Sequence, residues 1–305
     1  PPHWVNQTPT DQYNLVIIGG GTAGLVTAAI AAGLGAKVAL IERHLMGGDC
    51  LNVGCVPSKA LIRASRAWAD RRRGEGFGLR FSGEAKEDFP AVMTRMRTLR
   101  AQLGRTDSAQ RFTGLGVDVY LGQAQFTSAQ TVQVGSATLD FAKAAICTGA
   151  RASAPPIPGL QEAGYLTNET IFSLTELPAK LAIIGAGPIG CELAQAFARF
   201  GSQLYLIEAL HGIMPNEDRD AADIVEKALV RDGVTLFCCG KELTIQKTET
   251  GKRLTGGSHG RAYDITVDDI LVGAGRTPNV DGLGLEAAGV GYDKTGVTVD
   301  DHLRP

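Results

Sequence analysis

The chain contains an internal repeat. Residues Leu15–Glu42 align with residues Leu181–Glu208 at an offset of 166, over 28 positions without a gap, and 12 of these positions are identical. Each copy has a short apolar run, a Gly-x-Gly-x-x-Gly sequence, a helix-forming stretch and a second apolar run that ends in glutamate. The first runs, Leu15–Ile18 and Leu181–Ile184, are too short for helices and are typical of strands buried on both faces of a parallel sheet. The repeat therefore predicts an α/β fold.

The three glycines of each copy have different roles in a Rossmann-like dinucleotide-binding domain. The first allows the tight turn from strand to helix, the second lets backbone N–H groups approach a pyrophosphate, and the third lets the helix pack on the strand. The anion then lies at the helix N-terminus. In chain order these glycines are Gly19, Gly21 and Gly24 in the first copy, and Gly185, Gly187 and Gly190 in the second. Two copies in phase predict two bound dinucleotides.

A glutamate closes each copy at the end of its second apolar run. Glu42 and Glu208 each lie 23 residues after the first glycine of their copy, where a carboxylate can accept hydrogen bonds from ribose hydroxyls. A carboxylate at Glu208 would also repel a 2′-phosphate, so NAD is expected rather than NADP. We include Arg43 in the first nucleotide site and Ile189 in the second.

Two cysteines lie between the repeats, in the segment GGDCLNVGCVPSK that covers residues 47–59. Four residues separate Cys50 from Cys55, and a helical stretch, Ala60–Arg73, follows. Near the first turn of a distorted helix the two sulfurs could meet. A helix N-terminus stabilises a thiolate, and Lys59 would lower a nearby thiol pKa further. The segment indicates an exchangeable disulfide.

Two other interpretations of these cysteines remain open, a zinc site and inert buried thiols. A zinc site needs two more ligands with partner spacing. The other close pair, Cys238 and Cys239, falls inside an apolar segment, Val234–Cys239, that is predicted to be a strand, and it is interpreted as packing. No metal-ligating residue is predicted.

Composition excludes several classes of protein. Lys and Arg number 30 against 32 Asp and Glu, a net charge of −2, and the run Arg71–Arg73 stands alone, so nucleic acid is not an expected partner. Glycines interrupt the longest uncharged run, Leu15–Ala36, near its start, which argues against a membrane span. Six cysteines are too few for a disulfide-stapled secreted scaffold, so we expect a reducing, cytoplasmic environment.

These motifs together resemble the class I pyridine nucleotide–disulfide oxidoreductases. The cysteine segment, both glycine motifs, Cys147–Ala150 and Gly273–Asn279 carry the resemblance. It implies FAD at the first glycine motif and NAD(P)H at the second. It also implies an FAD-binding domain over residues 1–152, an inserted NAD(P)-binding domain over 153–275, and a return to the FAD domain over 276–305.

The resemblance assigns roles to individual residues. Cys55 would be the sulfur against the flavin, forming a charge-transfer thiolate, and Cys50 would be the interchange sulfur that meets substrate. Lys59 would lie near the reactive nitrogen of the flavin and pair with Glu192. Further positions expected near FAD are Gly48, Asp49, Ala124, Thr148, Gly149 and Arg276, and Gly275 is expected in the NAD site.

Within the family the chain looks closest to the mercuric-reductase-like branch, with electrons passing from NAD(P)H through FAD to the Cys50–Cys55 pair and on to a disulfide or Hg(II). The alternatives are a dihydrolipoamide dehydrogenase, a flavin-dependent NADH oxidase or diaphorase, and a non-catalytic nucleotide-binding fragment. Asp49 and Glu208 depart from the pattern of that branch. The family continues beyond the position of Pro305 into a dimerisation domain that carries a His-Pro motif, so we expect a truncated version of a longer, homodimeric protein.

Overall fold

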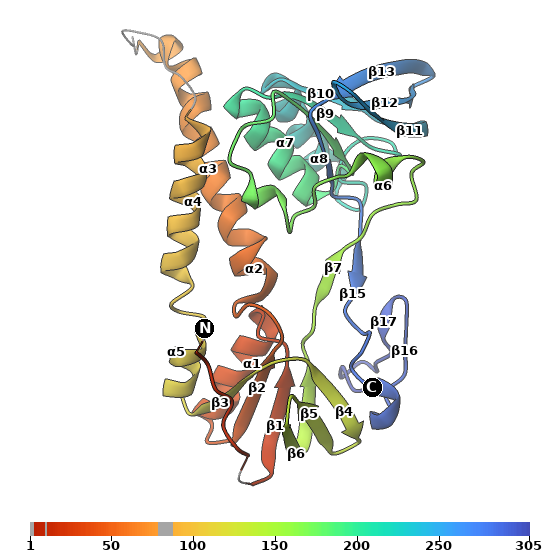
Figure 1. Cartoon of the computed structure of the whole chain (residues 1–305). Coiled ribbons are helices and arrows are strands. Elements are labelled where there is room, and N and C mark those ends of the chain that lie inside the picture. The colour runs from red at the N-terminus through yellow and green to blue at the C-terminus, as the bar shows by residue number, and fades with distance from the viewer. Residues whose placement is uncertain (1–2, 10, 79–87) are drawn as a thin grey trace. The chain divides into compact units, whose positions relative to one another are not determined.

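The computed structural model describes residues 3–9, 11–78 and 88–305. The described residues belong to two compact units (Figure 1). Unit 1 comprises Pro1–Cys55, Arg100–Arg151 and Arg276–Pro305, and unit 2 comprises Val56–Leu99 and Ala152–Gly275. Both units combine parallel strands with helices, which confirms the predicted α/β class.

The described part of unit 1 is built on a six-stranded sheet in the order β3-β2-β1-β6-β5-β4. Strands β3, β2, β1 and β6 are parallel, and β6, β5 and β4 are antiparallel. In Figure 1, α1 lies against β1 and β2. The bounds are β1 (Tyr13–Ile18), α1 (Thr22–Gly33), β2 (Val38–Glu42), α2 (Gly48–Asn52), α5 (Ala109–Gly114), β3 (Val117–Leu121), β4 (Ala124–Ser128), β5 (Thr131–Val134) and β6 (Ala137–Ile146).

Both faces of this sheet are covered, as the continuous apolar runs predict. Alternate residues such as Ile17 and Leu40 pack with α1 and α5, whereas Val16 and Ile41 pack with the antiparallel strands and with the C-terminal segment around Leu283. The remaining elements of unit 1 include β15 (Arg276–Pro278), η3 (Leu285–Ala288), β16 (Tyr292–Asp293) and β17 (Gly296–Val297). Strand β7 (Ala150–Ala152) pairs with β15 where the chain leaves unit 1 and returns to it.

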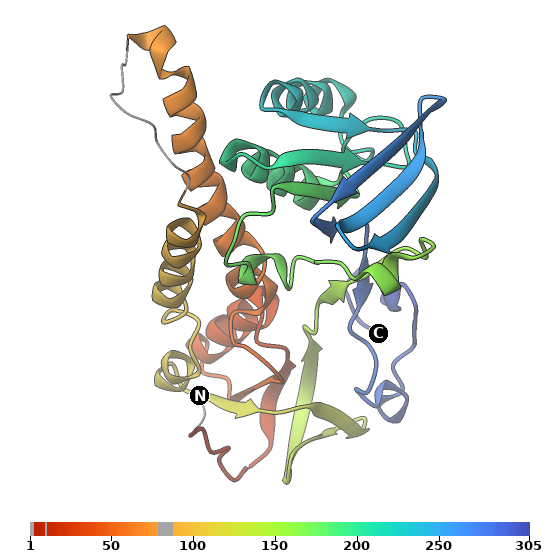
Figure 2. The same cartoon turned by 45° about the horizontal axis from the view of Figure 1, so that its top comes forward.

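The described part of unit 2 contains a parallel sheet in the order β10-β9-β8-β14 and an antiparallel sheet in the order β11-β12-β13. Figure 2 shows the antiparallel sheet, in blue, turned across the parallel strands. Apolar residues of the two sheets, among them Ile184, Ile270 and Leu254, form one core. The bounds are α6 (Leu160–Ala163), η2 (Ile171–Ser173), β8 (Lys180–Ile184), α7 (Pro188–Phe200), β9 (Gln203–Ile207), α8 (Arg219–Arg231), β10 (Val234–Phe237), β11 (Lys241–Thr248), β12 (Gly251–Ser258), β13 (Arg261–Val267) and β14 (Asp269–Val272).

The two units differ from the predicted domains in where they place a pair of long helices. Helix α3 (Cys55–Arg73), followed by η1 (Gly74–Phe77), runs beside α4 (Phe89–Leu103) in both views (Figures 1 and 2). Most residues of these helices group with unit 2, whereas the sequence assigns them to the first domain. The reason is long-range packing: the ring of Phe89 lies 5.8 Å from the rings of both Phe197 and Phe200.

A buried carboxylate strengthens the same association. Asp232 is 4% exposed and pairs with Arg73 of α3 and with Arg199 of α7. Removing one partner of such a buried group is costly, because the other charge is left uncompensated. Among the described residues, no helix combines the length and the apolar character needed to cross a bilayer.

Candidate functional site

Backbone conformation and close packing within the protein require glycine at the first and third positions of each repeat copy. Gly19 has φ +113°, and a Cβ there would lie 2.2 Å from the carbonyl oxygen of Cys147; Gly185 has φ +103°. A Cβ on Gly24 would lie 1.8 Å from the carbonyl oxygen of Gly19, and one on Gly190 would lie 1.9 Å from that of Gly185. Each helix therefore approaches its own strand too closely for any side chain at the third position.

The second glycines are different, because no contact among the described residues requires them. Gly21 and Gly187 have φ values of −86° and −72°, which any residue can adopt. A Cβ on Gly21 would meet only the Cα of Gly48, at 3.6 Å, and one on Gly187 would meet nothing within 4 Å. The free space lies at the N-termini of α1 and α7, where backbone N–H groups favour an anion. This is the geometry of two phosphate cradles.

The closing glutamates hold the glycine loops by the same bonds in both copies. Glu42 is 8% exposed, and its carboxylate accepts hydrogen bonds from the backbone N–H of Gly20 at 2.7 Å and of His44 at 2.7 Å. Glu208 accepts from Ala186 at 2.8 Å and from Leu210 at 3.0 Å. All three positions keep the offset of 166. Each carboxylate thus fixes the turn beside the cradle and keeps lone pairs for a further donor.

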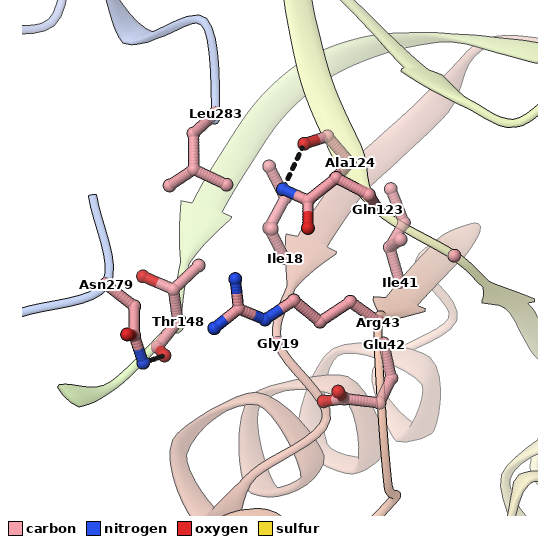
Figure 3. Close-up of a pocket in the computed structure, with 11 residues that line it drawn as sticks. Ile18, Gly19, Ile41, Glu42, Arg43, Gln123, Ala124, Thr148, Asn279 and Leu283 are labelled. Carbon is pink, nitrogen blue, oxygen red and sulfur yellow. Dashed lines mark hydrogen bonds between the residues drawn. The ribbon is translucent and has the colours of Figure 1, made fainter. Parts of the chain in front are cut away.

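A pocket in unit 1 opens beside the first cradle (Figure 3). In Figure 3, Arg43 extends across the pocket toward Thr148 and Asn279. Asn279 donates a hydrogen bond from Nδ2 to the carbonyl oxygen of Thr148, at 2.9 Å. Five predicted residues line the pocket, namely Gly19, Glu42, Arg43, Ala124 and Thr148, together with six that the sequence analysis did not single out: Ile18, Ile41, Gly122, Gln123, Asn279 and Leu283.

A larger cavity, of about 740 Å³, lies in unit 2 at the second cradle. Such a volume is within the range of small-molecule and cofactor sites. Its lining includes the predicted residues Gly185, Gly187, Glu208 and Gly275, but not Ile189 or Gly190, which lie in α7. Two more carboxylates, Glu217 and Glu242, line it, whereas no Lys, Arg or His does among the described residues.

The two cysteines of the pair lie on two consecutive helices. Cys50 lies in α2 and Cys55 begins α3, five residues before the expected start of that helix at Ala60. The side chains of the two cysteines are hydrogen-bonded to each other. The Cys55 thiol and, second, burial raise the pKa of Cys50, with a smaller opposite effect from the Thr22 hydroxyl.

Helix α2 is anchored directly on the first glycine loop. The backbone N–H of Gly47 donates to the carbonyl oxygen of Gly20 at 2.8 Å. Gly48 has φ +57°, and a Cβ on it would lie 2.5 Å from the Cα of Gly21. The Thr22 hydroxyl that hydrogen-bonds Cys50 belongs to the first residue of α1. The cysteine pair and the first phosphate cradle are therefore one continuous structure.

The negative charge of Asp49, the residue beside Cys50, is compensated by an arginine that is distant in the sequence. Arg276 pairs with the Asp49 carboxylate and also donates to the carbonyl oxygen of Ala150. Gly149, with φ +64°, accepts a hydrogen bond from the backbone N–H of Asn279 at 2.9 Å. The two predicted crossover segments of unit 1 thus meet, with Arg276 joined to the cysteine helix.

Lys59 and Glu192 form an ion pair within unit 2, with 2.7 Å between Nζ and Oε1. Lys59 lies on α3 and Glu192 on α7. The sequence alone gave no reason for this pairing, which the family resemblance implied.

One cluster of potential ligands was missed by the sequence analysis. Strand β10 ends at Phe237, so Cys238 and Cys239 follow the strand instead of lying in it. Their sulfurs and a ring nitrogen of His259 lie within 4.8 Å of one another. His259 lies 20 positions after Cys239, and this separation matches no ligand spacing from which the cluster could have been predicted.

Comparison with known proteins gives consistent relatives. Residues 13–305 match the family described as "Pyridine nucleotide-disulphide oxidoreductase". A mercuric reductase of Lysinibacillus sphaericus is 37% identical over 283 residues, which are 92% of this chain and 51% of the relative. A dihydrolipoyl dehydrogenase of Acholeplasma laidlawii is 33% identical over 297 residues, 96% of this chain and 86% of the relative.

Solved structures agree with these relatives. The HOCl-induced flavoprotein disulfide reductase RclA of Escherichia coli superimposes with a TM-score of 0.81 at 31% identity, covering 96% of this chain and 63% of that one. The chain spans about half the length of the mercuric reductases of Lysinibacillus sphaericus and Bacillus cereus that it matches.

Proposed function

Because the chain belongs to the pyridine nucleotide-disulphide oxidoreductase family, we propose that it passes electrons from NADH through FAD to the cysteine pair Cys50–Cys55. Two electrons and two protons convert the disulfide of the pair into two thiols. The thiols then either exchange with a small disulfide, which takes the two electrons from them, or bind Hg(II) as a dithiolate, whose reduction to Hg(0) would draw two further electrons from NADH. The observation that carries the proposal is the backbone contact between the N-terminus of α2 and the first glycine loop. It ties Cys50 to the cradle that would hold FAD.

The residues of unit 1 fit the diphosphate and adenosine portions of FAD. The space beside Gly21, which a Cβ would fill, is supported on one side by Gly48. The pocket lined by Glu42, Arg43 and Ala124 adjoins it and suits a nucleoside. FAD, when bound, supplies two-electron exchange between a hydride donor and a dithiol.

The chain's own groups set the charges around the thiols. Cys55 hydrogen-bonds Cys50 and raises its pKa. Arg276 neutralises Asp49, so that the carboxylate next to Cys50 adds less repulsion when a thiolate forms. Lys59, paired with Glu192, is proposed to lie near the flavin.

NADH is proposed as the electron donor, because the cavity of unit 2 is acidic. Glu208, Glu217 and Glu242 line it without a basic residue, and a 2′-phosphate would meet like charge there. Ordinary ribose hydroxyls can instead donate to Glu208.

Hg(II) is proposed as the terminal acceptor ahead of lipoamide-type disulfides. Two thiols in contact are suited to a soft metal ion, and mercuric reductases recur among the relatives. The dihydrolipoyl dehydrogenase relative, most of whose length the chain covers, supports the second candidate. We also propose a cytoplasmic location, and a homodimer for the full-length protein.

An anaerobic NADH titration of FAD-loaded protein tests the proposal. One equivalent of NADH should add two titratable thiols, and the Cys50→Ser and Cys55→Ser variants should add none. Cys147→Ser, which alters a half-buried cysteine outside the pair, is the matched control and should behave as the parent chain. An unchanged thiol count in the parent chain would refute electron transfer to the pair. Lipoamide, glutathione disulfide and Hg(II), each offered with excess NADH, then rank the acceptors by the rate of NADH oxidation, since Hg(II) masks thiols by binding alone.

A further inference from the structure

A group of sulfur and imidazole ligands lies in unit 2, outside the proposed redox site. Cys238 Sγ lies 2.9 Å from His259 Nε2, and Cys239 Sγ lies 3.3 Å from His211 Nδ1. The two sulfurs and the ligating nitrogen of His259 are all within 4.8 Å of one another. The rings of His211 and His259 are 6.1 Å apart. Two thiols and one imidazole therefore gather at one point, and a second imidazole, that of His211, contacts the thiol of Cys239.

The four side chains come from three separate segments, held together by backbone hydrogen bonds. The cysteines follow β10, His259 lies in the turn between β12 and β13, and His211 follows β9. The Ser258 hydroxyl donates to the carbonyl oxygen of Cys238 at 2.8 Å. The N–H of Cys239 donates to the carbonyl oxygen of Leu210 at 2.9 Å. The ligands are thus preorganised by their neighbours in sequence.

Two of these residues adopt an unfavourable backbone conformation. Cys239 has φ +54° and His259 has φ +48°, in the left-handed region that residues with a Cβ rarely occupy. Such strain persists where surrounding structure imposes it, and it is common at ligand sites. His259 and Gly260, with φ +76°, form the two-residue turn between β12 and β13, and the turn presents the His259 ring at the end of this hairpin.

We propose that Cys238, Cys239 and His259 bind a thiophilic closed-shell cation such as Zn²⁺, with His211 as the fourth ligand. A set of two sulfurs and two nitrogens is typical of tetrahedral zinc. Zinc bonds of about 2.3 Å to sulfur and about 2.0 Å to nitrogen separate tetrahedral S and N ligands by roughly 3.5 Å. The observed 2.9 and 3.3 Å contacts need to open only slightly. Two thiolates also balance the charge of a divalent ion.

The site adjoins the cavity proposed for NADH. Leu210, which bonds Cys239, and Gly240, whose N–H donates to the carbonyl oxygen of Glu208 at 3.0 Å, both line that cavity. A bound cation would clamp the segment after β9 to the segment after β10. The metal should therefore alter NADH affinity, a consequence that rests on the proposed function, whereas metal binding itself does not.

The test uses the full chain with Cys50→Ser and Cys55→Ser as the background, so that the redox pair cannot bind the ion. Anaerobic, reduced protein is titrated with Zn²⁺ in competition with a chromophoric chelator, and separately with Hg²⁺. We expect one equivalent of Zn²⁺ to bind, at least 100-fold more weakly after Cys239→Ser and at least 10-fold more weakly after His259→Gln. Both side chains are at least partly exposed, so these variants should fold. Adding Cys147→Ser is the matched control and should change nothing.

The outcomes separate the alternatives. Binding of Hg²⁺ without Zn²⁺ would support the site and assign it to the softer ion. Binding of neither ion, or binding that Cys239→Ser and His259→Gln leave unchanged, would overturn the proposal. A Cys238–Cys239 disulfide that survives reductant, detected by mass spectrometry, would also overturn it. Co²⁺ substitution provides an independent readout, because sulfur-to-cobalt absorption should appear in the parent background and vanish in the Cys239→Ser variant.

Discussion

The two copies of the internal repeat share a scaffold and differ in what surrounds it. Strand pairing keeps the same register, with Leu15 opposite Val38 in one copy and Leu181 opposite Leu204 in the other. The glutamate bonds to the glycine loops also repeat. The surroundings diverge: Gly48 of the cysteine helix packs against Gly21, whereas nothing lies within 4 Å of a Cβ on Gly187.

The electrostatic environment diverges as well. Arg43 follows the closing glutamate of the first copy, and Ala209 takes the equivalent position in the second. The second cavity is lined by further carboxylates. Under the proposed function, the repeat would provide the diphosphate cradle common to two dinucleotides, and the flanking segments would decide which dinucleotide each cradle accepts.

The largest expected effect comes from the third glycine, where the two copies should respond alike. Gly24→Ala and Gly190→Ala each place a Cβ within 2 Å of a carbonyl oxygen. Overpacking costs typically about 1–3 kcal/mol and occasionally more, and we expect about 3 kcal/mol or more of lost stability in the affected unit. Hydrogen exchange read separately over each unit provides the measurement.

A control for this prediction lies in the same helix. Gly33 of α1 has nothing within 4 Å of its Cβ position, so Gly33→Ala should be neutral or stabilise by up to about 1 kcal/mol through helix propensity. Equal destabilisation by Gly24→Ala and Gly33→Ala would show that close approach is not the reason for glycine at position 24.

The second glycine should separate the two copies. Gly21→Val fills the first cradle and should weaken FAD binding at least 100-fold, about 2.8 kcal/mol, while NADH binding persists. Gly187→Val should do the reverse. Visible absorbance of the purified protein and NADH titration measure the two effects, and each variant serves as the control for the other. A Gly21→Val protein that retains FAD would contradict the assignment of the first cradle.

A smaller effect should follow when the second copy receives the first copy's arginine. Ala209→Arg adds a positive charge to the acidic cavity without disturbing the hydrogen bonds of Glu208, which Glu208→Arg would remove. The ratio of NADPH to NADH affinity should rise about tenfold, or about 1.4 kcal/mol. Ala209→Gln controls for side-chain size. An unchanged ratio, or an equal change with glutamine, would mean that the ribose does not lie near Glu208.

The smallest effect concerns thiol reactivity near the two glycine loops. Burial raises the pKa of Cys191 to about 12, so its thiolate should be scarce at pH 8 and its alkylation negligible until strongly alkaline pH. The pKa of Cys50 is raised chiefly by its hydrogen bond with Cys55. Cys55→Ala should therefore lower it and increase Cys50 alkylation a few-fold at pH 8. Mass spectrometry after timed iodoacetamide labelling tests both expectations. Slower labelling of Cys50 in the Cys55→Ala variant would show that Cys55 does not raise the pKa of Cys50.

Spacing along the chain was enough to predict the two glycine loops, their closing glutamates and the position of the cysteine pair. These features depend on residues close together in the chain, since a strand, a glycine turn and a helix follow one another within 30 residues and leave fixed spacings. The hydrogen bonds between Glu42 and Gly20 and between Glu208 and Ala186 each join residues of the same copy. The α/β class follows from the same local pattern of strand, glycine turn and helix.

Only the tertiary structure decided the contacts between distant segments. Arg276 reaches Asp49 across 227 residues, Asn279 closes the first pocket at Thr148, and the ring of Phe89 brings α4 to α7. The strand that was expected to include Cys239 ends at Phe237, which releases the cysteines toward His259. Such partners have no constant separation along the chain, because loops of any length can join them, and so they become visible only when packing brings the side chains together.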